Sequence, residues 1–189
     1  MRAKPVAMLV GAALLVAACS SNAGSSDGAA ASAGSGPLIA TTVSPITSIA
    51  ASIAGDKARV EGIVPEGTNS HTYEPAPQVA QLLSNADLIF VNGLKLEDPT
   101  LDLAETNKKA ETPIVEIGTE VIPESDYIYD FSFPKEEGKP NPHLWTDPTY
   151  AIKYAEVIKD TVAAEYPANA DYYTANYEAF VVKATALSD

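Results

Sequence analysis

The chain has 189 residues and a formal net charge of −13, with 25 acidic side chains against 12 basic ones. A protein of this charge repels a phosphate backbone, so the composition argues against a nucleic-acid-binding function. The negative field would favour the capture of a divalent cation, although solubility explains an acidic surface equally well.

The first 18 residues are predicted to be a targeting signal. Arg2 and Lys4 precede an apolar run over residues 6–17, which is too short to cross a bilayer and is typical of a secretory signal peptide. Small residues then lead to Cys19, the only cysteine of the chain. This arrangement resembles a bacterial lipoprotein box, in which the cysteine becomes the lipidated first residue. We therefore expect residues 1–18 to be removed, the alternative being an ordinary signal peptide with an incidental cysteine.

Residues 19–36 are predicted to form a flexible tether. After Cys19 they contain only Ser, Asn, Ala, Gly and Asp, so they have no large apolar side chain whose burial could offset the entropy of ordering. The folded part is expected to begin at Pro37. The remaining chain is long enough for one hydrophobic core.

From Pro37 onward, short apolar strands alternate with helical segments. Strands are predicted at residues 38–43, 58–64, 87–91 and 113–117. Helices are predicted at residues 45–54, 77–84, 99–109, 150–164 and 170–187. This alternation predicts an α/β fold in which a parallel sheet is covered by helices on both faces.

The connection over residues 118–141 is predicted to be long and irregular. Aromatic residues stand at every second position in its middle: Tyr127, Tyr129, Phe131 and Phe133. This spacing favours an edge strand, or a loop packed by its own rings, over an aromatic ligand box. Beyond it, Asp147 is followed by Pro148 and is predicted to cap the next helix rather than to bind a metal.

The last predicted helix carries one apolar stripe. Its members recur at helical spacing: Tyr173, Tyr177, Phe180, Ala184 and Leu187. No Gly or Pro follows residue 168, so the chain is interpreted as ending inside a helix, by truncation.

The chain has two histidines, His71 and His143, and each is followed by an aromatic residue, a carboxylate and a proline in that order. Imidazole is the commonest protein ligand of a transition metal; an aromatic ring can shield such a site and a carboxylate can orient the imidazole. The histidines follow the second and fourth predicted strands, and ligands of parallel sheets bind beyond the carboxyl ends of strands. We therefore predict that His71 and His143 approach each other and share a metal, the alternative being two satisfied loop histidines beside proline turns.

Three segments resemble a known family. They are residues 65–77 (PEGTNSHTYEPAP), residues 86–97 (ADLIFVNGLKLE) and residues 141–148 (NPHLWTDP). They are similar to the ligand loops and a strand–turn segment of the zinc/manganese substrate-binding proteins of ABC transporters (cluster A-I). They stand in that family's order and at compatible spacing, over most of residues 37–189.

The resemblance implies a first lobe over residues 37–169 and the start of a long interlobe helix over residues 170–189. It also implies that His71 and His143 bind Zn²⁺ or Mn²⁺ between two lobes. A second lobe, beyond the end of this chain, would add a His or Glu and an Asp. The resemblance implies a receptor and not an enzyme. It would be anchored to the membrane, outside the cytoplasm, through lipid on Cys19. There it would deliver its metal ion to an ABC permease subunit.

Two other classes remain open. A self-contained zinc hydrolase needs three protein ligands and a water, so Glu74 or Asp147 would have to complete the histidine pair. An adhesin-like surface lipoprotein would bind only a partner, and no residue pattern points to it directly.

Overall fold

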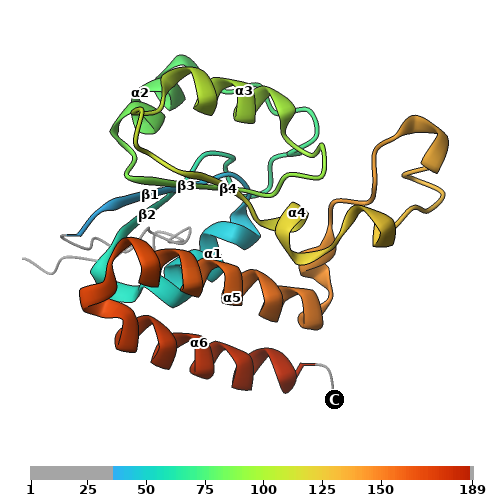
Figure 1. Cartoon of the computed structure of the whole chain (residues 1–189). Helices are drawn as coiled ribbons and strands as arrows, with labels where there is room; N and C mark the ends of the chain where they lie inside the picture. The colour runs from blue at the N-terminus through green and yellow to red at the C-terminus, as the bar shows by residue number, and fades with distance from the viewer. Residues whose placement is uncertain (1–35, 188–189) are drawn as a thin grey trace, which may run out of the picture.

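The computed structural model describes residues 36–187, which are drawn in colour in Figure 1. The predicted signal peptide, Cys19 and residues 20–35 of the predicted tether lie outside the described residues. Within residues 36–187, no helix is long and apolar enough to cross a membrane.

The centre of the domain is a sheet of four parallel strands in the order β2-β1-β3-β4. The strands are β1 (Leu38–Thr41), β2 (Arg59–Gly62), β3 (Leu88–Val91) and β4 (Ile114–Glu116). All four lie within the predicted strands, and each is shorter than the predicted range. After β2, for example, Ile63 and Val64 still donate to the carbonyls of Thr41 and Thr42, but they lie beyond the regular ladder.

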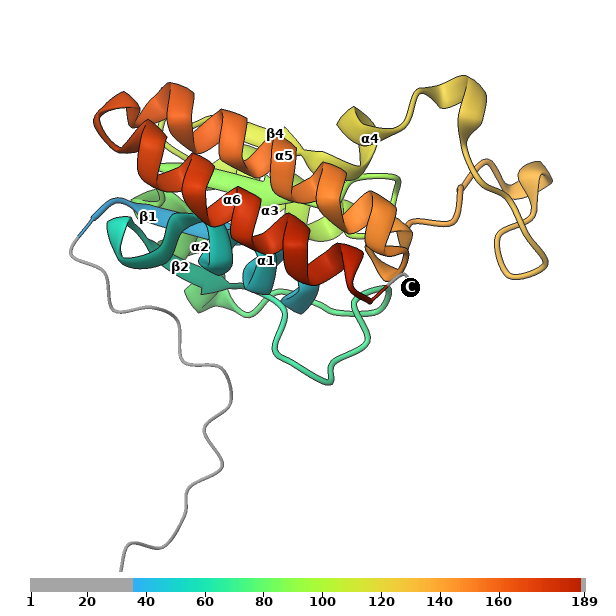
Figure 2. The ribbon, with the colours of Figure 1, turned by 90° about the horizontal axis from the view of Figure 1, so that it is seen from below.

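Helices cover both faces of the sheet, as the alternation of elements predicted. They are α1 (Ser44–Ala54), α2 (Pro77–Asn85), α3 (Asp98–Asn107), α5 (Pro148–Glu165) and α6 (Ala170–Thr185). Figures 1 and 2 show α2 and α3 on one face and α1 and α5 on the other, with α6 packed on α1 and α5. Because the sheet is covered twice, every residue of β1 and β3 is buried.

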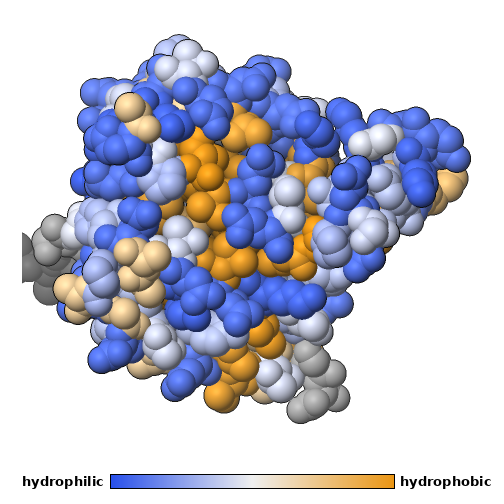
Figure 3. Space-filling model, in the orientation of Figure 1, coloured by the Kyte–Doolittle hydropathy of each residue, from blue (hydrophilic) through white to orange (hydrophobic). Residues whose placement is uncertain are grey.

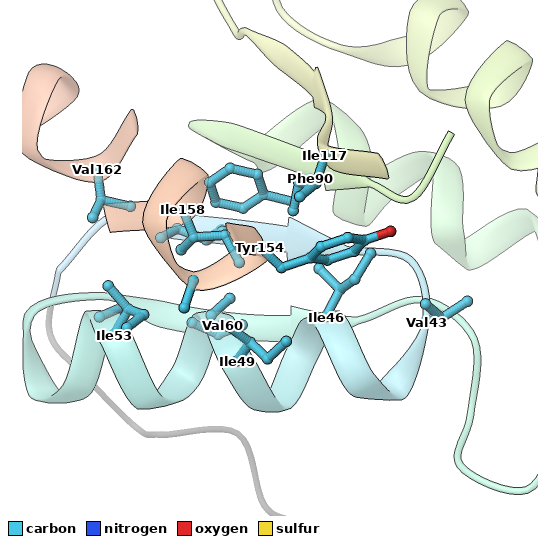
Figure 4. Close-up of a cluster of buried hydrophobic side chains, with 14 of the residues drawn as sticks. Val43, Ile46, Ile49, Ile53, Val60, Phe90, Ile117, Tyr154, Ile158 and Val162 are labelled. Carbon is cyan, nitrogen blue, oxygen red and sulfur yellow. The ribbon is translucent and has the colours of Figure 1, made fainter. Parts of the chain in front are cut away.

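The larger core lies between the sheet and the α1–α5 layer, as Figure 4 shows. Alternate strand residues point into it, while their neighbours point toward α2 and α3. Its labelled members include Ile46, Ile53, Val60, Phe90, Tyr154 and Ile158, each fully buried. Burial of each such side chain contributes roughly 1.5–3 kcal/mol, so this layer holds α5, and the loop before it, against the sheet.

The apolar stripe of α6 packs within this same domain. Tyr173 and Ala184 are buried, and Tyr177 and Phe180 are partly buried against the larger core. The prediction was wrong for Leu187, whose side chain is 81% exposed, because the helix ends at Thr185.

The segment between β4 and α5 protrudes from the domain (Figure 1). It begins with the short helix α4 (Ile117–Val121) and continues through isolated 3-10 turns, without any strand in its described structure. The prediction of an edge strand, or of rings packed on one another, was wrong. Tyr127 packs against the core and Phe131 is fully exposed. Pro134 and Pro140 have no backbone N–H to donate, so a strand could not continue regularly through these two positions.

A tight left-handed turn follows β3. Gly93, Leu94 and Lys95 have φ values of 74°, 55° and 65°. Two of the three are not glycine, and such residues rarely adopt this conformation, so the turn must be held by its surroundings.

The carboxylate of Glu97 holds this turn. Its Oε1 accepts hydrogen bonds from the backbone N–H of Asn92 and from Thr42 Oγ1, both at 2.6 Å. Glu97 is only 4% exposed, and burial raises the pKa of its carboxyl group. The turn is therefore closed by a buried acid that faces neutral donors.

We predict that Glu97→Ala lowers the free energy of unfolding by at least about 2 kcal/mol, because two buried donors lose their acceptor. Glu97→Gln keeps an acceptor oxygen and removes the buried charge, so this variant should be at least as stable as the parent at neutral pH. The raised pKa means that ionised Glu97 destabilises the fold above its folded pKa. The advantage of Gln should therefore disappear as pH falls to the ordinary Glu value of 4.5.

Chemical denaturation of the parent and both variants at neutral and acidic pH measures these differences. Equal stability of Glu97→Ala and Glu97→Gln would show that the turn does not depend on the acceptor.

Candidate metal centre

The two histidines meet beyond the carboxyl ends of the strands. His71 lies in the loop between β2 and α2, and His143 directly precedes the 3-10 turn Leu144–Thr146 that leads into α5. Although β2 and β4 form opposite edges of the sheet, the Nε2 atoms of the two rings are 3.0 Å apart. The predicted approach of His71 and His143 is confirmed.

This separation suits two ligands of one ion. Two nitrogens bound to the same metal at about 2.0–2.1 Å, with an angle between 90° and 110°, lie roughly 2.9–3.4 Å apart. The rings would therefore need little movement to share an ion. Without an ion, 3.0 Å fits an N–H···N hydrogen bond in which one neutral ring donates to the other.

An asparagine two residues before each histidine shapes its loop. Asn69 Oδ1 accepts the backbone N–H of His71, and Asn141 Oδ1 accepts the backbone N–H of His143, each at 3.0 Å. Both are turns closed by an Asn side chain onto the backbone two residues later. Neither asparagine was predicted from the sequence, although the repeated pattern Asn-x-His was a visible signal.

The ring of His143 is held more firmly than that of His71. Its Nδ1 atom lies 3.0 Å from Asn141 Oδ1, and the residue is half-buried, whereas His71 is exposed. Burial, followed by the nearby His71, lowers the pKa of His143. His143 is thereby kept in the neutral form, which is the form that binds a metal.

Two aromatic rings pack against the pair. The Phe133 ring lies 5.8 Å from that of His71 and 5.5 Å from that of His143, and Trp145 stands edge-on to His143 at 5.3 Å. Trp145 acts as the sequence pattern predicted, but Tyr73 packs against the hydrophobic core. Phe133 takes the shielding position, so one ring of the irregular segment does reach the site.

The carboxylates that follow the histidines in sequence have other places. Asp147 Oδ1 accepts the backbone N–H of Thr149 at 2.7 Å, which confirms the predicted cap of α5. Glu74 is exposed. The expectation that one of these carboxylates orients an imidazole was wrong for His143, because Asn141 contacts its ring instead. The Asn141 Nδ2 group in turn donates to Asp130 Oδ2 at 2.7 Å.

Asn92 ties the His143 loop to the sheet. Its Nδ2 group donates to the carbonyl of Pro142 at 3.1 Å, and its Oδ1 accepts from the hydroxyl of Tyr154 at 2.7 Å. Its own carbonyl accepts the N–H of Gly118 at 2.8 Å. A Cβ at residue 118 would lie 2.7 Å from this carbonyl oxygen, so only glycine permits the contact. This role of Asn92 was not predicted from the sequence.

The surroundings leave the pair accessible. A cavity of about 430 Å³ borders His71 and is lined in part by Lys95, Asp98 and Lys139. The face seen in Figure 3 is largely hydrophilic, with hydrophobic residues gathered in a band across its middle. Within residues 36–187, no group of three or more His, Cys, Asp or Glu side chains is placed to hold a metal. A closed transition-metal site has about four ligands, so His71 and His143 by themselves could supply only part of such a site.

The chain matches one protein-family model, ZnuA, described as the periplasmic component A of a zinc-uptake complex, over residues 39–189. It is 37% identical to the metal ABC transporter substrate-binding lipoprotein ScbA of Streptococcus cristatus, over 91% of this chain and 54% of that protein. It is 34% identical to the manganese-binding lipoprotein MntA of Halalkalibacterium halodurans, over 89% of this chain and 53% of that protein.

A solved structure agrees with these relatives. The periplasmic zinc-binding protein TroA of Treponema pallidum superposes with a TM-score of 0.72 at 25% identity, over 80% of this chain and 52% of TroA. The chain thus spans about half the length of the curated relatives it matches. With the family model covering most of the described domain, this chain belongs to the ZnuA family of periplasmic zinc-uptake components.

Proposed function

We propose that this chain forms the first lobe of an extracytoplasmic solute-binding lipoprotein that captures Zn²⁺ or Mn²⁺ and delivers it to an ABC permease. The observation that carries the proposal is the 3.0 Å approach of His71 Nε2 and His143 Nε2 from opposite edges of the sheet. Relatives named for manganese binding and for metal transport support it.

The histidine pair supplies two of the ligands in this proposal. The remaining ligands come from a second lobe, as a His or Glu and an Asp, which agrees with relatives about twice as long as this chain. Residues 37–169 are then the first lobe, and residues 170–189 begin the interlobe helix. A nitrogen-rich set favours zinc and added carboxylates favour manganese, so the second-lobe ligands decide between the two metals.

The activity we propose is binding without turnover. A zinc hydrolase needs three protein ligands and a general base around an open position, and the described residues supply two apposed imidazoles. Adhesion to a partner does not require two imidazole nitrogens 3.0 Å apart. Both classes are therefore less well supported than a receptor.

The lipid anchor completes the proposal. Removal of residues 1–18 and acylation of Cys19 would hold the receptor at the outer face of the membrane, beside its permease. The acidic excess of the chain, which would grow when Arg2 and Lys4 are removed with the signal peptide, would raise the local concentration of divalent cations there.

We predict that His71→Ala and His143→Ala each weaken Zn²⁺ binding more than about 100-fold, because each variant loses one of only two imidazoles. Loss of a residue that merely supports a metal ligand typically costs about 10–100-fold, and loss of the ligand itself should cost more. Calorimetric titration of the metal-free chain with Zn²⁺ and with Mn²⁺ measures the affinity. Glu74→Gln and Asp147→Asn are the controls, and both should bind as the parent does.

Loss of binding in either control would instead support a site completed inside this chain, as the hydrolase alternative requires. Unchanged binding in both histidine variants would contradict the receptor proposal.

We predict that the native protein lacks residues 1–18 and carries an acyl group on Cys19, because the apolar run and small residues before it form a lipoprotein signal. Mass spectrometry of protein extracted from the membrane fraction should show both changes. Cys19→Ser should remove the acyl group and release the protein from that fraction. A secreted protein with an unmodified Cys19 would refute the anchor.

A further inference from the structure

The two histidine loops differ at one contact. In both, an asparagine Oδ1 accepts the backbone N–H of the histidine two residues later. Only Asn141 also reaches a ring, with its Oδ1 3.0 Å from Nδ1 of His143. The Nδ1 atom of His71 makes no hydrogen bond to a described residue.

The orientation of the Asn141 amide is fixed from two sides. The backbone N–H of His143 can only donate, so the atom that faces it must be the oxygen Oδ1. The carboxylate of Asp130 accepts, so the atom that faces it must be the Nδ2 group, at 2.7 Å. Both requirements give the same orientation, and a flipped amide would break both contacts.

This orientation decides which nitrogen of His143 carries the proton. Oδ1 has no hydrogen, so the contact with Nδ1 is a hydrogen bond only if Nδ1 is protonated. A neutral imidazole has one N–H, and the lone pair is therefore left on Nε2. Nε2 is the atom that faces His71.

Asp130 is well placed to act through Asn141. Besides Asn141, its carboxylate accepts the backbone N–H groups of Ser132 at 2.8 Å and Phe133 at 3.0 Å. The same carboxylate thus fixes the turn that places Phe133 against both imidazoles. The protruding segment is tied to the ligand loop through this one side chain.

We propose that Asp130 and Asn141 are positioning residues that preset His143 as the Nδ1–H tautomer, with the lone pair that would bind the metal on Nε2. The inference rests on the proposed function, because the tautomer of His143 matters for function only if His143 binds a metal. Partners that hold the second nitrogen of a metal-bound histidine fix its orientation and raise its basicity.

The same chemistry assigns the opposite tautomer to His71 in the metal-free protein. Because His143 Nε2 is an acceptor, the contact between the two Nε2 atoms requires the proton on His71 Nε2. When a metal binds, His71 gives this proton to water and takes one from water at Nδ1, so no net proton is released. His143 is the preset ligand and His71 is the ligand that rearranges.

Long-range ¹H–¹⁵N NMR of the metal-free chain, labelled at histidine, reads both tautomers at neutral pH. We expect Nδ1–H for His143 and Nε2–H for His71 in the parent. Asn141→Ala should shift His143 toward Nε2–H and weaken Zn²⁺ binding about 10–100-fold. Asn69→Ala is the matched control, because it removes the equivalent backbone bond of His71 and leaves both ring contacts in place.

An exchange variant separates positioning from a structural role. Asp130→Asn combined with Asn141→Asp reverses the two groups but keeps an amide donor facing a carboxylate, and it keeps an acceptor for His143 Nδ1. This double variant should restore the parent tautomer and most of the Zn²⁺ affinity. It also carries the test should Asn141→Ala fail to fold.

The outcomes distinguish the two proposals. An Asn141→Ala protein that keeps His143 as Nδ1–H and binds Zn²⁺ as the parent does would overturn the positioning role. An exchange variant that folds but leaves His143 as Nε2–H would overturn it too. Parent-like Zn²⁺ binding by His143→Ala would instead overturn the proposed function, whatever the tautomers.

Discussion

The candidate metal centre depends on one buried amide, that of Asn92. Its side chain joins the end of β3 to the carbonyl of Pro142 and to the hydroxyl of Tyr154, and its backbone binds Gly118 and Glu97. Three segments distant in sequence, at Gly118, Pro142 and Tyr154, are thereby fixed at the carboxyl end of β3. Each of these polar groups would cost about 1–3 kcal/mol if it were buried without its partner, so the arrangement is held as a unit rather than bond by bond.

The site built on this anchor has a fixed side and an adaptable side. His143 is half-buried, is bonded through Nδ1 and is packed against Trp145. His71 is exposed, and among the described residues its ring is hydrogen-bonded only to His143. A metal ligand of the first kind needs no reordering when an ion arrives, and one of the second kind can move to suit the ion. Together they allow a partial site to exist before the metal does.

The sequence predicted the parallel sheet, the helical layers and the meeting of His71 with His143, because burial periodicity and strand ends depend on local pattern. It did not predict Phe133 or Asp130, which lie in a segment without periodicity where prolines and turns decide the path. The alternating rings there were misleading, since an alternating pattern predicts a strand only if the backbone can pair. Asn69 and Asn141 could have been found from their repeated position, and Leu187 was misplaced because the end of a helix is poorly marked in sequence.

The origin of the two ligands couples the metal to the whole fold. His71 follows β2 and His143 follows β4, which are the two outer strands, so their Nε2 atoms meet only when all four strands are in order. An unfolded chain holds the histidines far apart and has no equivalent site. Any ion that bridges them must therefore stabilise the folded state by an amount set by its concentration relative to its dissociation constant. The strained turn at Leu94 and Lys95, the buried carboxylate of Glu97 and the two histidine loops belong to one cooperative fold. In the proposed receptor, assembly of the sheet and capture of an ion would therefore support each other.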